Sequence, residues 1–449
     1  NGGYKEIHSV LIIKDNKLVF EEYFPGHDYE YSAEEHKGKL IQYNMNTIHN
    51  LASVTKSVTS LLFGIAVDKG FIKGVDEKLY KFFPQDSSLF EGSKKNITLQ
   101  NLLTMSSGLK WNENDMPYSN TANDIVQLFI VVDPVKYILS KPLANEPGTN
   151  FYYNGGGTNL IGKIIQEKSK LRLDDFAQKY LFDPLGIKQN KWVYINPGFV
   201  YASGDLRLRP RDMAKLGLLA LNKGVWNDSQ IISSEWIDEI KTKHVWMNDT
   251  DGYGYQWWLK KYKFGSSEIN TYFASGWGGQ LIIVVPEVNS VIVLTAGNYI
   301  DKSPHNEILN RYIFPSIIKD FTYDFGAIDK ATPLPDSINI ISPDSGVKKD
   351  IAIMSGCWYG SWGYYLPSRF IVEKINDTEA EVIYSWADIP GSLKKGWIRK
   401  TAAIDPDGNI KFTNGDVSWK YYYDKEDNTL IGFYDTPSIH EKIIMKRKE

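Results

Sequence analysis

Apolar and polar positions alternate in two segments that lie far apart in the chain. Residues 7–24, IHSVLIIKDNKLVFEEYF, form two halves rich in β-branched and aromatic residues around a polar turn at 14–17. Residues 278–297, GGQLIIVVPEVNSVIVLTAG, repeat this arrangement around a turn at 286–289. Such runs on either side of a turn are typical of β-hairpins. The pattern therefore predicts one hairpin near the N-terminus and another close to residue 290.

Between the hairpins, the apolar positions change to the helical period. After residue 53 they recur at Val54, Val58, Leu61, Leu62 and Ile65. Further helices are expected at 97–111, ending in a Ser-Ser-Gly sequence, and at 210–224, which begins with Pro and ends with Gly. Strands at both ends with helices between them predict an α+β domain. It would be an antiparallel sheet flanked by helices, with an all-helical subdomain.

A proline-rich segment follows this domain. Residues 331–349, ATPLPDSINIISPDSGVKK, predict a linker. Residues 350–449 contain short alternating segments between turns such as Asp407-Gly408 and Asn414-Gly415, which predicts an all-β barrel or sandwich. The expected organisation is a first domain over 1–330, the linker, and a small all-β domain over 350–449.

The composition excludes several classes of function. A formal net charge of -3 over 449 residues gives no basic excess, so no nucleic-acid partner is expected. The single cysteine, Cys357, permits no intramolecular disulfide, and its aromatic surroundings predict a buried, inert thiol. The seven histidines are scattered, so we expect no metal and no other cofactor; His49 is expected in a cap or loop. No apolar run is long enough to cross a bilayer.

The spacing Ser-x-x-Lys occurs five times, and its context singles out one copy. The copies are Ser53/Lys56, Ser107/Lys110, Ser316/Lys319, Ser345/Lys348 and Ser392/Lys395. Ser53 begins a long apolar helix, where residues i and i+3 share a face, so Lys56 can approach its hydroxyl. Free N–H groups at a helix start stabilise a developing oxyanion, and burial would lower the pKa of Lys56 and give a neutral amine base. The alternative is that Ser53 is only an N-cap.

Two later segments supply further candidate groups, each with a simpler structural explanation. Residues 147–165 place Tyr152 and Tyr153 before a Gly-rich turn; a phenol near an ammonium can act as a base, or both rings can be packing aromatics. Residues 273–285, FASGWGGQLIIVV, place small residues before a strand, where an N–H can bind an oxyanion or glycines can form a tight turn. Asp205 is expected to line the pocket or to form a turn.

Taken in order, these segments resemble the motif set of the serine β-lactamase and penicillin-recognising enzyme superfamily. The resemblance covers about residues 7–319. LLTMSSGL (102–109) and SGDLRLRPRDMAKLGLLALNKG (203–224) are similar to the class C-like β-lactamase-related serine hydrolases, a group of esterases, D-amino-acid peptidases and 6-aminohexanoate-dimer hydrolases. The resemblance implies a β-lactamase-like fold and a metal-free serine hydrolase.

The resemblance also assigns roles to residues. Ser53 would be the acylated nucleophile and Lys56 its proton partner. The second motif of the family is Tyr-x-Asn, and two registers compete. Literal matching gives Tyr152 with Asn154, whereas spacing gives Tyr153, with Gly155 in place of the asparagine. We prefer Tyr153 because spacing reflects the fold, and we keep Asn154 among the substrate-binding candidates.

The third motif departs from the family pattern. The family often has Lys-Thr-Gly or His-Thr-Gly, whereas this chain has Trp277-Gly278-Gly279 followed by Gln280. The backbone N–H groups of Ser53 and Gln280 would form the oxyanion hole. Without a cation or hydroxyl in the motif, a substrate carboxylate has no partner. This favours an esterase or amidase over an efficient β-lactamase or DD-peptidase.

The leading hypothesis is therefore a serine hydrolase that acts through an acyl-enzyme on a small-molecule or peptide-like ester or amide. One alternative is a penicillin-interacting D-amino-acid peptidase or a β-lactamase. Another is a catalytically weak protein that binds peptides or peptidoglycan. Asn1 is not Met, which a removed export signal or a shortened chain would explain; we expect an exported, periplasmic or extracellular protein of bacterial type.

Overall fold

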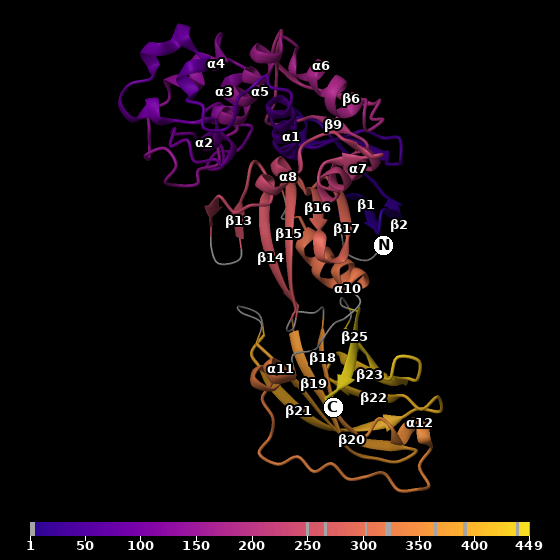
Figure 1. Ribbon diagram of the computed structural model, residues 1–449. Helices are drawn as coiled ribbons and strands as arrows, with labels where there is room; N and C mark the ends of the chain where they lie inside the picture. Colours follow the sequence, from indigo (N-terminus) through magenta and orange to yellow (C-terminus); the bar gives the residue numbers. More distant parts are fainter. Residues whose placement is uncertain are drawn as a thin grey trace. The chain divides into compact units, whose positions relative to one another are not determined.

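The computed structural model of the chain contains two compact units (Figure 1). One comprises Asn1–Tyr262 and Ile269–His305, and the other comprises Lys263–Glu268 and Asn306–Glu449. The domain limits expected from the sequence stay a prediction. The structure describes residues 5–247, 251–264, 267–300, 303–318, 325–362, 366–388, 393–436 and 440–448.

The first unit is built on an antiparallel sheet of eight strands in the order β12-β13-β14-β15-β16-β17-β1-β2. The strands are β1 (Ile7–Lys14), β2 (Lys17–Tyr23), β12 (Val245–Trp246), β13 (Asp251–Tyr253), β14 (Trp258–Phe264), β15 (Ser267–Gly276), β16 (Gln280–Val285) and β17 (Ser290–Ala296). β1 lies between β2 and β17 and pairs antiparallel with both. The two ends of the unit therefore form one sheet, as the alternating segments predict.

Helix α1 (Val54–Asp68) is the central helix of the first unit, and all its residues from Val54 to Ala66 are buried. A helix buried on every side has no solvent face, so its hydroxyl groups bond to neighbouring loops. Thr59 Oγ1 donates to the carbonyl of Ala202 at 2.7 Å, and Ser57 Oγ donates to that of Gln256 at 2.7 Å. These bonds fix two loops beside the first turn of α1.

Helix α7 (Pro210–Leu221) matches the predicted segment and contacts β16 and β17. Every residue of these two strands is buried. A Cβ at Gly217 would lie 2.4 Å from Val291 Cγ1, so glycine allows the close approach of helix and sheet. The helix expected at 97–111 is much shorter. It is α2 (Leu99–Leu103), and it ends where Met105 adopts a φ of 56°.

Further helices and small ribbons lie between the two hairpins of the first unit. The helices are α3 (Asp124–Leu128), α4 (Pro134–Ser140), α5 (Gly155–Ser169), α6 (Leu173–Ala177) and α8 (Ser234–Ile240). The ribbons pair β3 (Pro25–Tyr29) with β4 (Lys37–Gln42), β9 (Arg207–Leu208) with β5 (His49–Asn50) and β6 (Asn190–Lys191), β7 (Tyr194–Asn196) with β8 (Phe199–Val200), and β10 (Val225–Trp226) with β11 (Ser229–Gln230). The segment between the hairpins therefore mixes helices with small ribbons.

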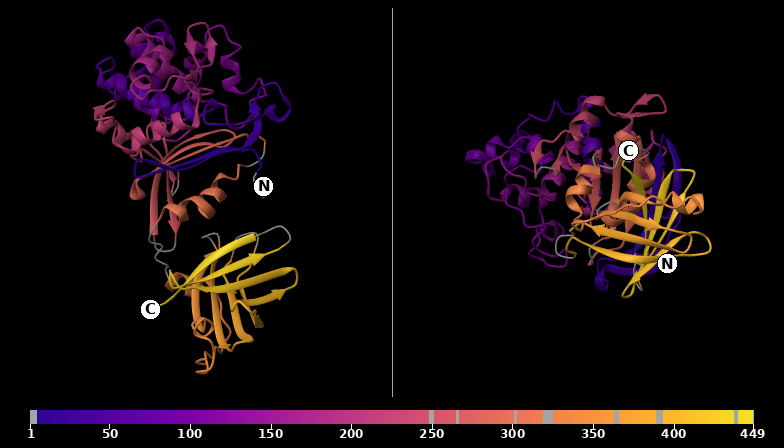
Figure 2. Two further views of the ribbon diagram at one scale, coloured as in Figure 1. Left: turned by 90° about the vertical axis from the view of Figure 1, so that its right-hand side faces the viewer. Right: turned by 90° about the horizontal axis from the view of Figure 1, so that it is seen from below.

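The second unit contains a closed barrel of eight strands (Figure 2). The strands are β18 (Gly356–Trp362), β19 (Leu366–Ile375), β20 (Glu379–Trp386), β21 (Gly396–Ile404), β22 (Ile410–Asn414), β23 (Val417–Asp424), β24 (Thr429–Asp435) and β25 (His440–Arg447). The short helices before the barrel are α9 (His305–Ile308), α10 (Phe314–Ile317), α11 (Phe325–Ala331) and α12 (Lys349–Ala352). The barrel confirms the predicted all-β domain.

Cys357 lies in β18 and is partly exposed, not buried as expected. Burial of its surroundings nevertheless raises the pKa of its thiol. Within the described ranges, no helix combines the length and the apolar character that a membrane span requires.

Candidate active site

The start of α1 presents Ser53 without using its hydroxyl as a helix cap. Ser53 is the N-cap residue, but its side chain makes no capping hydrogen bond. Ala52, just before it, has a φ of 44°, in the left-handed region that costs a residue other than glycine roughly 1–2 kcal/mol. Asn50 Oδ1 accepts the Ala52 N–H at 2.7 Å and holds this turn. The strained turn therefore leaves the hydroxyl to Lys56.

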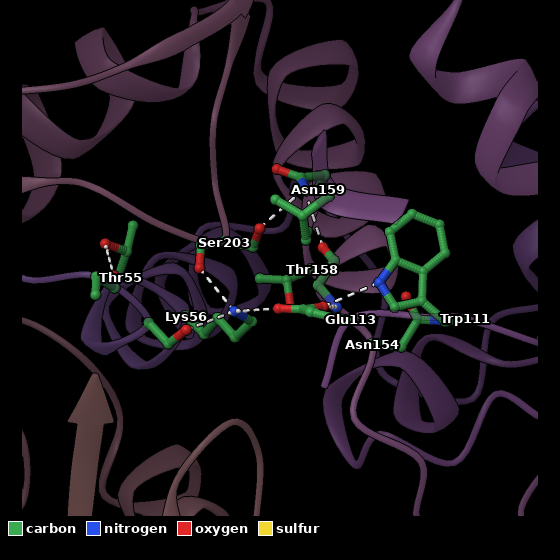
Figure 3. A network of polar contacts seen from close by, with 12 residues as sticks. Thr55, Lys56, Trp111, Glu113, Asn154, Thr158, Asn159 and Ser203 are labelled. Carbon is green, nitrogen blue, oxygen red and sulfur yellow. Dashed lines mark hydrogen bonds and ion pairs between the residues drawn. The ribbon is translucent and has the colours of Figure 1, made fainter. Parts of the chain in front are cut away.

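Three oxygens surround the Lys56 nitrogen (Figure 3). Lys56 is 2% exposed, and its Nζ donates to Ser53 Oγ at 2.9 Å and to the carbonyl of Ser203 at 2.8 Å. The Glu113 Oε1 atom lies 3.6 Å from the same nitrogen and forms an ion pair with it. The structure thus brings Ser53 and Lys56 together, with an acid beside them.

The surroundings of Lys56 hold it protonated, contrary to the expectation from the sequence. Burial alone lowers the pKa of a lysine. Charge interactions and hydrogen bonds with Tyr153 and Glu113 outweigh this effect, so the pKa of Lys56 is raised above its usual value. The prediction of a lowered pKa and a neutral amine is wrong, because no sequence pattern placed a carboxylate at this lysine. Lys56 therefore acts as an ammonium at neutral pH.

Of the two candidate tyrosines, Tyr153 lies against Lys56. The Lys56 Nζ is 4.8 Å from the centroid of the Tyr153 ring, and Tyr153 lines a cavity together with Ser53. Tyr152 packs against the hydrophobic core, and its N–H donates to the Met105 carbonyl at 2.7 Å. The tyrosine favoured by spacing is thus the one at the serine.

Asn154, a candidate substrate-binding residue, caps helix α5. Its Oδ1 accepts the Gly157 N–H at 2.9 Å, and the residue is 2% exposed. The cap explains why a polar residue stands between Tyr153 and the glycines. Asn154 lines neither of the two cavities at Ser53.

Glu113 lies beside Gly155, the residue that the preferred spacing assigns to the asparagine position of the second motif. Its Oε2 accepts the Trp111 Nε1–H at 2.9 Å and the Gly155 N–H at 2.7 Å. Gly155 stands where Tyr-x-Asn has its asparagine, and a Cβ there would lie 2.9 Å from Glu113 Oε2. The carboxylate therefore fills the space that a side chain at 155 would need.

The third segment lies differently from the expectation. Gln280 begins β16 and is fully buried. Its Nε2 donates to the carbonyls of Trp277 at 3.1 Å and Ala296 at 2.6 Å, so its amide closes the turn between β15 and β16. Gln280 lines neither cavity at Ser53. Gly278 and Gly279 form the turn, at φ values of 84° and 99° that favour glycine.

Residues 275–277, which come directly before this turn at the end of β15, lie beside Ser53. Ser275, Gly276 and Trp277 line the same cavity as the serine. A Cβ at Gly276 would lie 3.2 Å from Ser53 N and 2.3 Å from the Leu51 carbonyl, so glycine is required for this approach. The sequence predicted no hydroxyl in the third motif, but Ser275 brings one into the cavity.

Two backbone N–H groups at this point have no protein acceptor. Among the described residues, neither Ser53 N nor Trp277 N donates to another group. Backbone N–H groups in folded proteins are almost always paired. Unpaired N–H groups beside a hydroxyl are suited to bind an oxyanion that forms there.

Two cavities meet at Ser53. Their volumes are about 630 Å³ and about 660 Å³, and both are lined by Ser53, Tyr118 and Trp277. The first cavity is otherwise largely aromatic and apolar and includes Asp205. The second includes Tyr153 and Glu113. Cavities of this size accommodate small-molecule groups, so a bond that reacts at Ser53 has room on both sides.

The other copies of Ser-x-x-Lys form no comparable network. Ser107 Oγ accepts the Leu109 N–H at 3.4 Å, and Ser316 Oγ donates to the Ile313 carbonyl at 2.8 Å. In the described ranges, neither Ser107 nor Ser345 accepts a hydrogen bond from a lysine. Lys319 and Ser392 lie outside the described residues.

Comparison with known proteins decides the family. The model of the Beta-lactamase family matches residues 8–306. This chain belongs to the Beta-lactamase family. The matched range contains Ser53, Lys56 and Tyr153 as well as both cavities.

Proteins similar to this chain carry the names of different enzymes. The lovastatin esterase of Penicillium rubens is 28% identical over 39% of this chain and 46% of its own length. The 6-aminohexanoate-dimer hydrolase of Paenarthrobacter ureafaciens is 24% identical over 55% of this chain and 65% of its own. A solved structure, the putative 6-aminohexanoate-dimer hydrolase from Bacillus anthracis, has a TM-score of 0.57, 21% identity and coverage of 70% and 79%. The structural likeness shows the shared fold.

This Beta-lactamase-family site contains groups that the sequence analysis missed. One of these groups is Glu113, which follows the LLTMSSGL segment. The glycine at position 155 was the only signal for it, because a residue without a side chain leaves space for a group from another segment. Ser275 and Gly276 come directly before Trp277. Like the Thr-Gly of the family's third motif, they place a residue with a hydroxyl group before a glycine. Within the described part of the chain, no three His, Cys, Asp or Glu side chains gather as a metal site would require.

Proposed function

We propose that this chain is a serine hydrolase that acts through an acyl-enzyme on ester or amide substrates. The observation that carries the proposal is the 2.9 Å contact between Lys56 Nζ and Ser53 Oγ at the junction of two cavities. A serine that reacts covalently needs an activating partner within hydrogen-bonding distance and space for the groups on either side of the bond. Ser53 has both.

In this mechanism Ser53 Oγ attacks the carbonyl carbon, and the serine proton passes to Tyr153 in its phenolate form, which thereby becomes the neutral phenol. Lys56 is not the base, because its raised pKa keeps it protonated. Its ammonium instead stabilises the negative charge of a Tyr153 phenolate and of the attacking oxygen. Tyr153 then returns the proton to the leaving group, and in the second half-reaction it removes a proton from the water that releases the acyl group.

The oxyanion of the tetrahedral intermediate would be bound by the backbone N–H groups of Ser53 and Trp277. Both lack a protein acceptor in the described ranges, and Gly276 holds the Trp277 segment against Ser53. Trp277 N therefore takes the role that the sequence analysis gave to Gln280. Preorganised donors of this kind typically contribute about 10²–10³-fold to the rate.

Several observations favour an ester or small amide over a carboxylated peptide. The third motif carries no lysine, and the second cavity is lined by no lysine or arginine. Relatives named for ester and amide hydrolysis support this class. If a D-amino-acid peptidase, a β-lactamase or a weak peptide binder placed the substrate carboxylate in the second cavity, it would need a cation there, which this cavity does not supply.

The test is covalent labelling. The full chain is exposed briefly to a fluorophosphonate and, separately, to p-nitrophenyl butyrate, and its tryptic peptides are analysed by mass spectrometry. We expect one adduct on the Ser53 peptide and a burst of p-nitrophenol. Ser53→Ala removes both, and Ser107→Ala is the matched control. A folded protein that forms no adduct, or an adduct at Ser107, contradicts the proposal.

A further inference from the structure

The first cavity at Ser53 has aromatic walls. The ring centroids of Tyr118 and Trp277 are 5.0 Å apart, those of Tyr29 and Trp277 are 6.2 Å apart, and those of Phe129 and Tyr201 are 5.1 Å apart. All five residues line the cavity of about 630 Å³. The faces of aromatic rings carry partial negative charge and attract organic cations, ammonium ions above all.

Asp205 lines the same cavity and is held by a hydrogen bond and not by a direct ion pair within the described residues. Its Oδ1 accepts the Asn50 Nδ2–H at 3.0 Å. Within the described residues no Lys, Arg or His nitrogen forms an ion pair with it. Arg207 also lines the cavity, but its guanidinium pairs with Asp28 at 3.1 and 3.2 Å. Lys191, at the same cavity, makes no ion pair with Asp205. Asp205 is thus a carboxylate in an aromatic cavity that forms no direct ion pair within the described residues, although the charges of Arg207 and Lys56 act on it.

The backbone holds this carboxylate in place. Asp205 has a φ of 60°, in the left-handed region, and such strain gathers at functional sites. The same segment is held at two points, because Leu206 N donates to Thr55 Oγ1 at 3.1 Å and Ala202 N donates to Asn159 Oδ1 at 2.9 Å. Burial raises the pKa of Asp205, whereas the charges of Arg207 and Lys56 lower it. A bound cation would favour the charged form.

We propose that the first cavity binds a substrate group that carries an organic ammonium ion, with Asp205 as its counter-ion and the aromatic walls around it. The proposal rests on the hydrolase function proposed above. Aromatic walls and an unpaired carboxylate are the two features that recognise quaternary and primary ammonium groups. The cavity ends at Ser53, so the ammonium belongs to the acyl group or to the leaving group of the substrate being cleaved.

Two pairs of esters test this proposal, each pair differing only in charge. The acyl pair is the p-nitrophenyl ester of 4-trimethylammoniobutanoate and that of 5,5-dimethylhexanoate, in which carbon replaces nitrogen. The leaving-group pair is butyrylcholine and 3,3-dimethylbutyl butyrate. For each ester, kcat/KM is measured and divided by the rate constant of hydroxide-catalysed hydrolysis of the same ester. The corrected value of the cationic ester is then divided by that of the neutral ester of its pair. The pair that responds shows which side of the bond occupies the cavity.

We expect the full chain to prefer the cationic ester of one pair by about tenfold or more. Asp205→Asn keeps an Oδ1 acceptor for Asn50 but removes the charge, and it should bring this ratio close to one. Asp175→Asn removes an acid that is 59% exposed on α6 and should retain the ratio. A ratio near one in both pairs overturns the proposal. So does an equal loss for both esters in Asp205→Asn, which indicates only a structural role.

A binding measurement separates this proposal from the hydrolase function. If no ester is cleaved and no adduct forms on Ser53, the proposed function fails, but the cavity is still testable. Calorimetry on the full chain with Ser53→Ala then compares the ethyl esters of the two acyl groups. Tighter binding of the cationic ester that is lost on adding Asp205→Asn supports the ammonium site. Equal binding of both esters overturns it.

Discussion

His8 and His49 share a buried hydrogen bond, with 2.8 Å between His8 Nδ1 and His49 Nε2. Both side chains are almost fully buried, and His49 Nδ1 also donates to the carbonyl of Asn50 at 2.7 Å. Two imidazoles can share this bond only if at least one is neutral. His49 lies in the short strand β5, not in the cap or loop expected for it, and its bond to the Asn50 carbonyl supports the turn before Ser53.

This pair predicts that the first unit loses stability in acid. Burial lowers the pKa of His8 to about 4 and that of His49 to about 3, from an ordinary value of 6.5. Between pH 6.5 and 4 the unfolded chain binds protons that the folded chain does not. The free energy of unfolding therefore falls as the pH decreases, by up to about 1.4 kcal/mol per pH unit for each histidine.

Urea unfolding at pH 7, 6 and 5 measures this dependence. His49→Gln should reduce the slope of stability against pH, and His244→Gln serves as the control. Glu6 contacts His8 at 3.3 Å and its pKa is lowered, so its own contribution is lost only at lower pH. A stability that does not change between pH 7 and 5 would contradict the buried neutral pair.

A second prediction concerns the charge of Glu113. Glu113→Gln removes the carboxylate that helps to raise the pKa of Lys56, so this pKa should fall. The alkaline limb of kcat/KM, which requires the ammonium, should then move to lower pH. At neutral pH we expect a loss of about 10- to 100-fold, as for one charge-assisted contact. Glu167→Gln, on the exposed face of α5, is the control. If the pH profile of Glu113→Gln is identical to that of the unchanged protein, Glu113 does not raise the pKa of Lys56.

A third prediction follows from the space at position 155. In Gly155→Ala the new Cβ would meet Ile125 Cδ1 at 2.7 Å and Glu113 Oε2 at 2.9 Å, so the network must shift. We expect a loss of about 1–3 kcal/mol in stability, as for overpacking, together with lower activity. Gly346→Ala is the matched control because no atom lies within 4 Å of its added Cβ. Equal stability of the two variants would show that the carboxylate does not fill this place.

A fourth prediction separates the two tyrosines. Tyr153→Phe keeps the ring beside Lys56 but removes the oxygen that accepts the serine proton, so kcat/KM should fall by about 10²–10⁴-fold. Tyr152→Phe should stay within a few-fold of the unchanged protein, because Tyr152 only packs against the core. Hydrolysis of p-nitrophenyl butyrate measures both. The opposite order would reverse the register chosen for the second motif.

The fold could be predicted where one physical period dominated a segment. The alternation in β1 and β17 predicted the sheet, and the turn-separated strands of the last hundred residues predicted the barrel. Helix α7 kept its expected start because Pro210 stands at its first position. The predicted length of the helix at 97–111 is wrong, because α2 ends early at the left-handed backbone of Met105, which no periodicity reveals.

The site was less predictable because its chemistry depends on contacts across the fold. The Ser53–Lys56 pair lies within one helical turn, so spacing alone could indicate it. The pKa of Lys56 depends on Glu113, fifty-seven residues further along the chain, and local reasoning gave the wrong direction. Likewise, only the tight turn between β15 and β16 decides that residues 275–277, and not Gln280, lie beside the serine.

The pairing of β1 with β17 also affects how the chain is made. Ile13 lies opposite Val291, so β1 waits for about 280 further residues before its main partner exists. At ordinary rates of synthesis this takes roughly 15–60 seconds. During that time the apolar strand IHSVLIIK has only its hairpin partner β2 and is open to wrong pairing with other chains. Strand β1 is thus synthesised long before its pairing can be completed, and we expect the yield of folded protein to depend on chaperones or on slow growth.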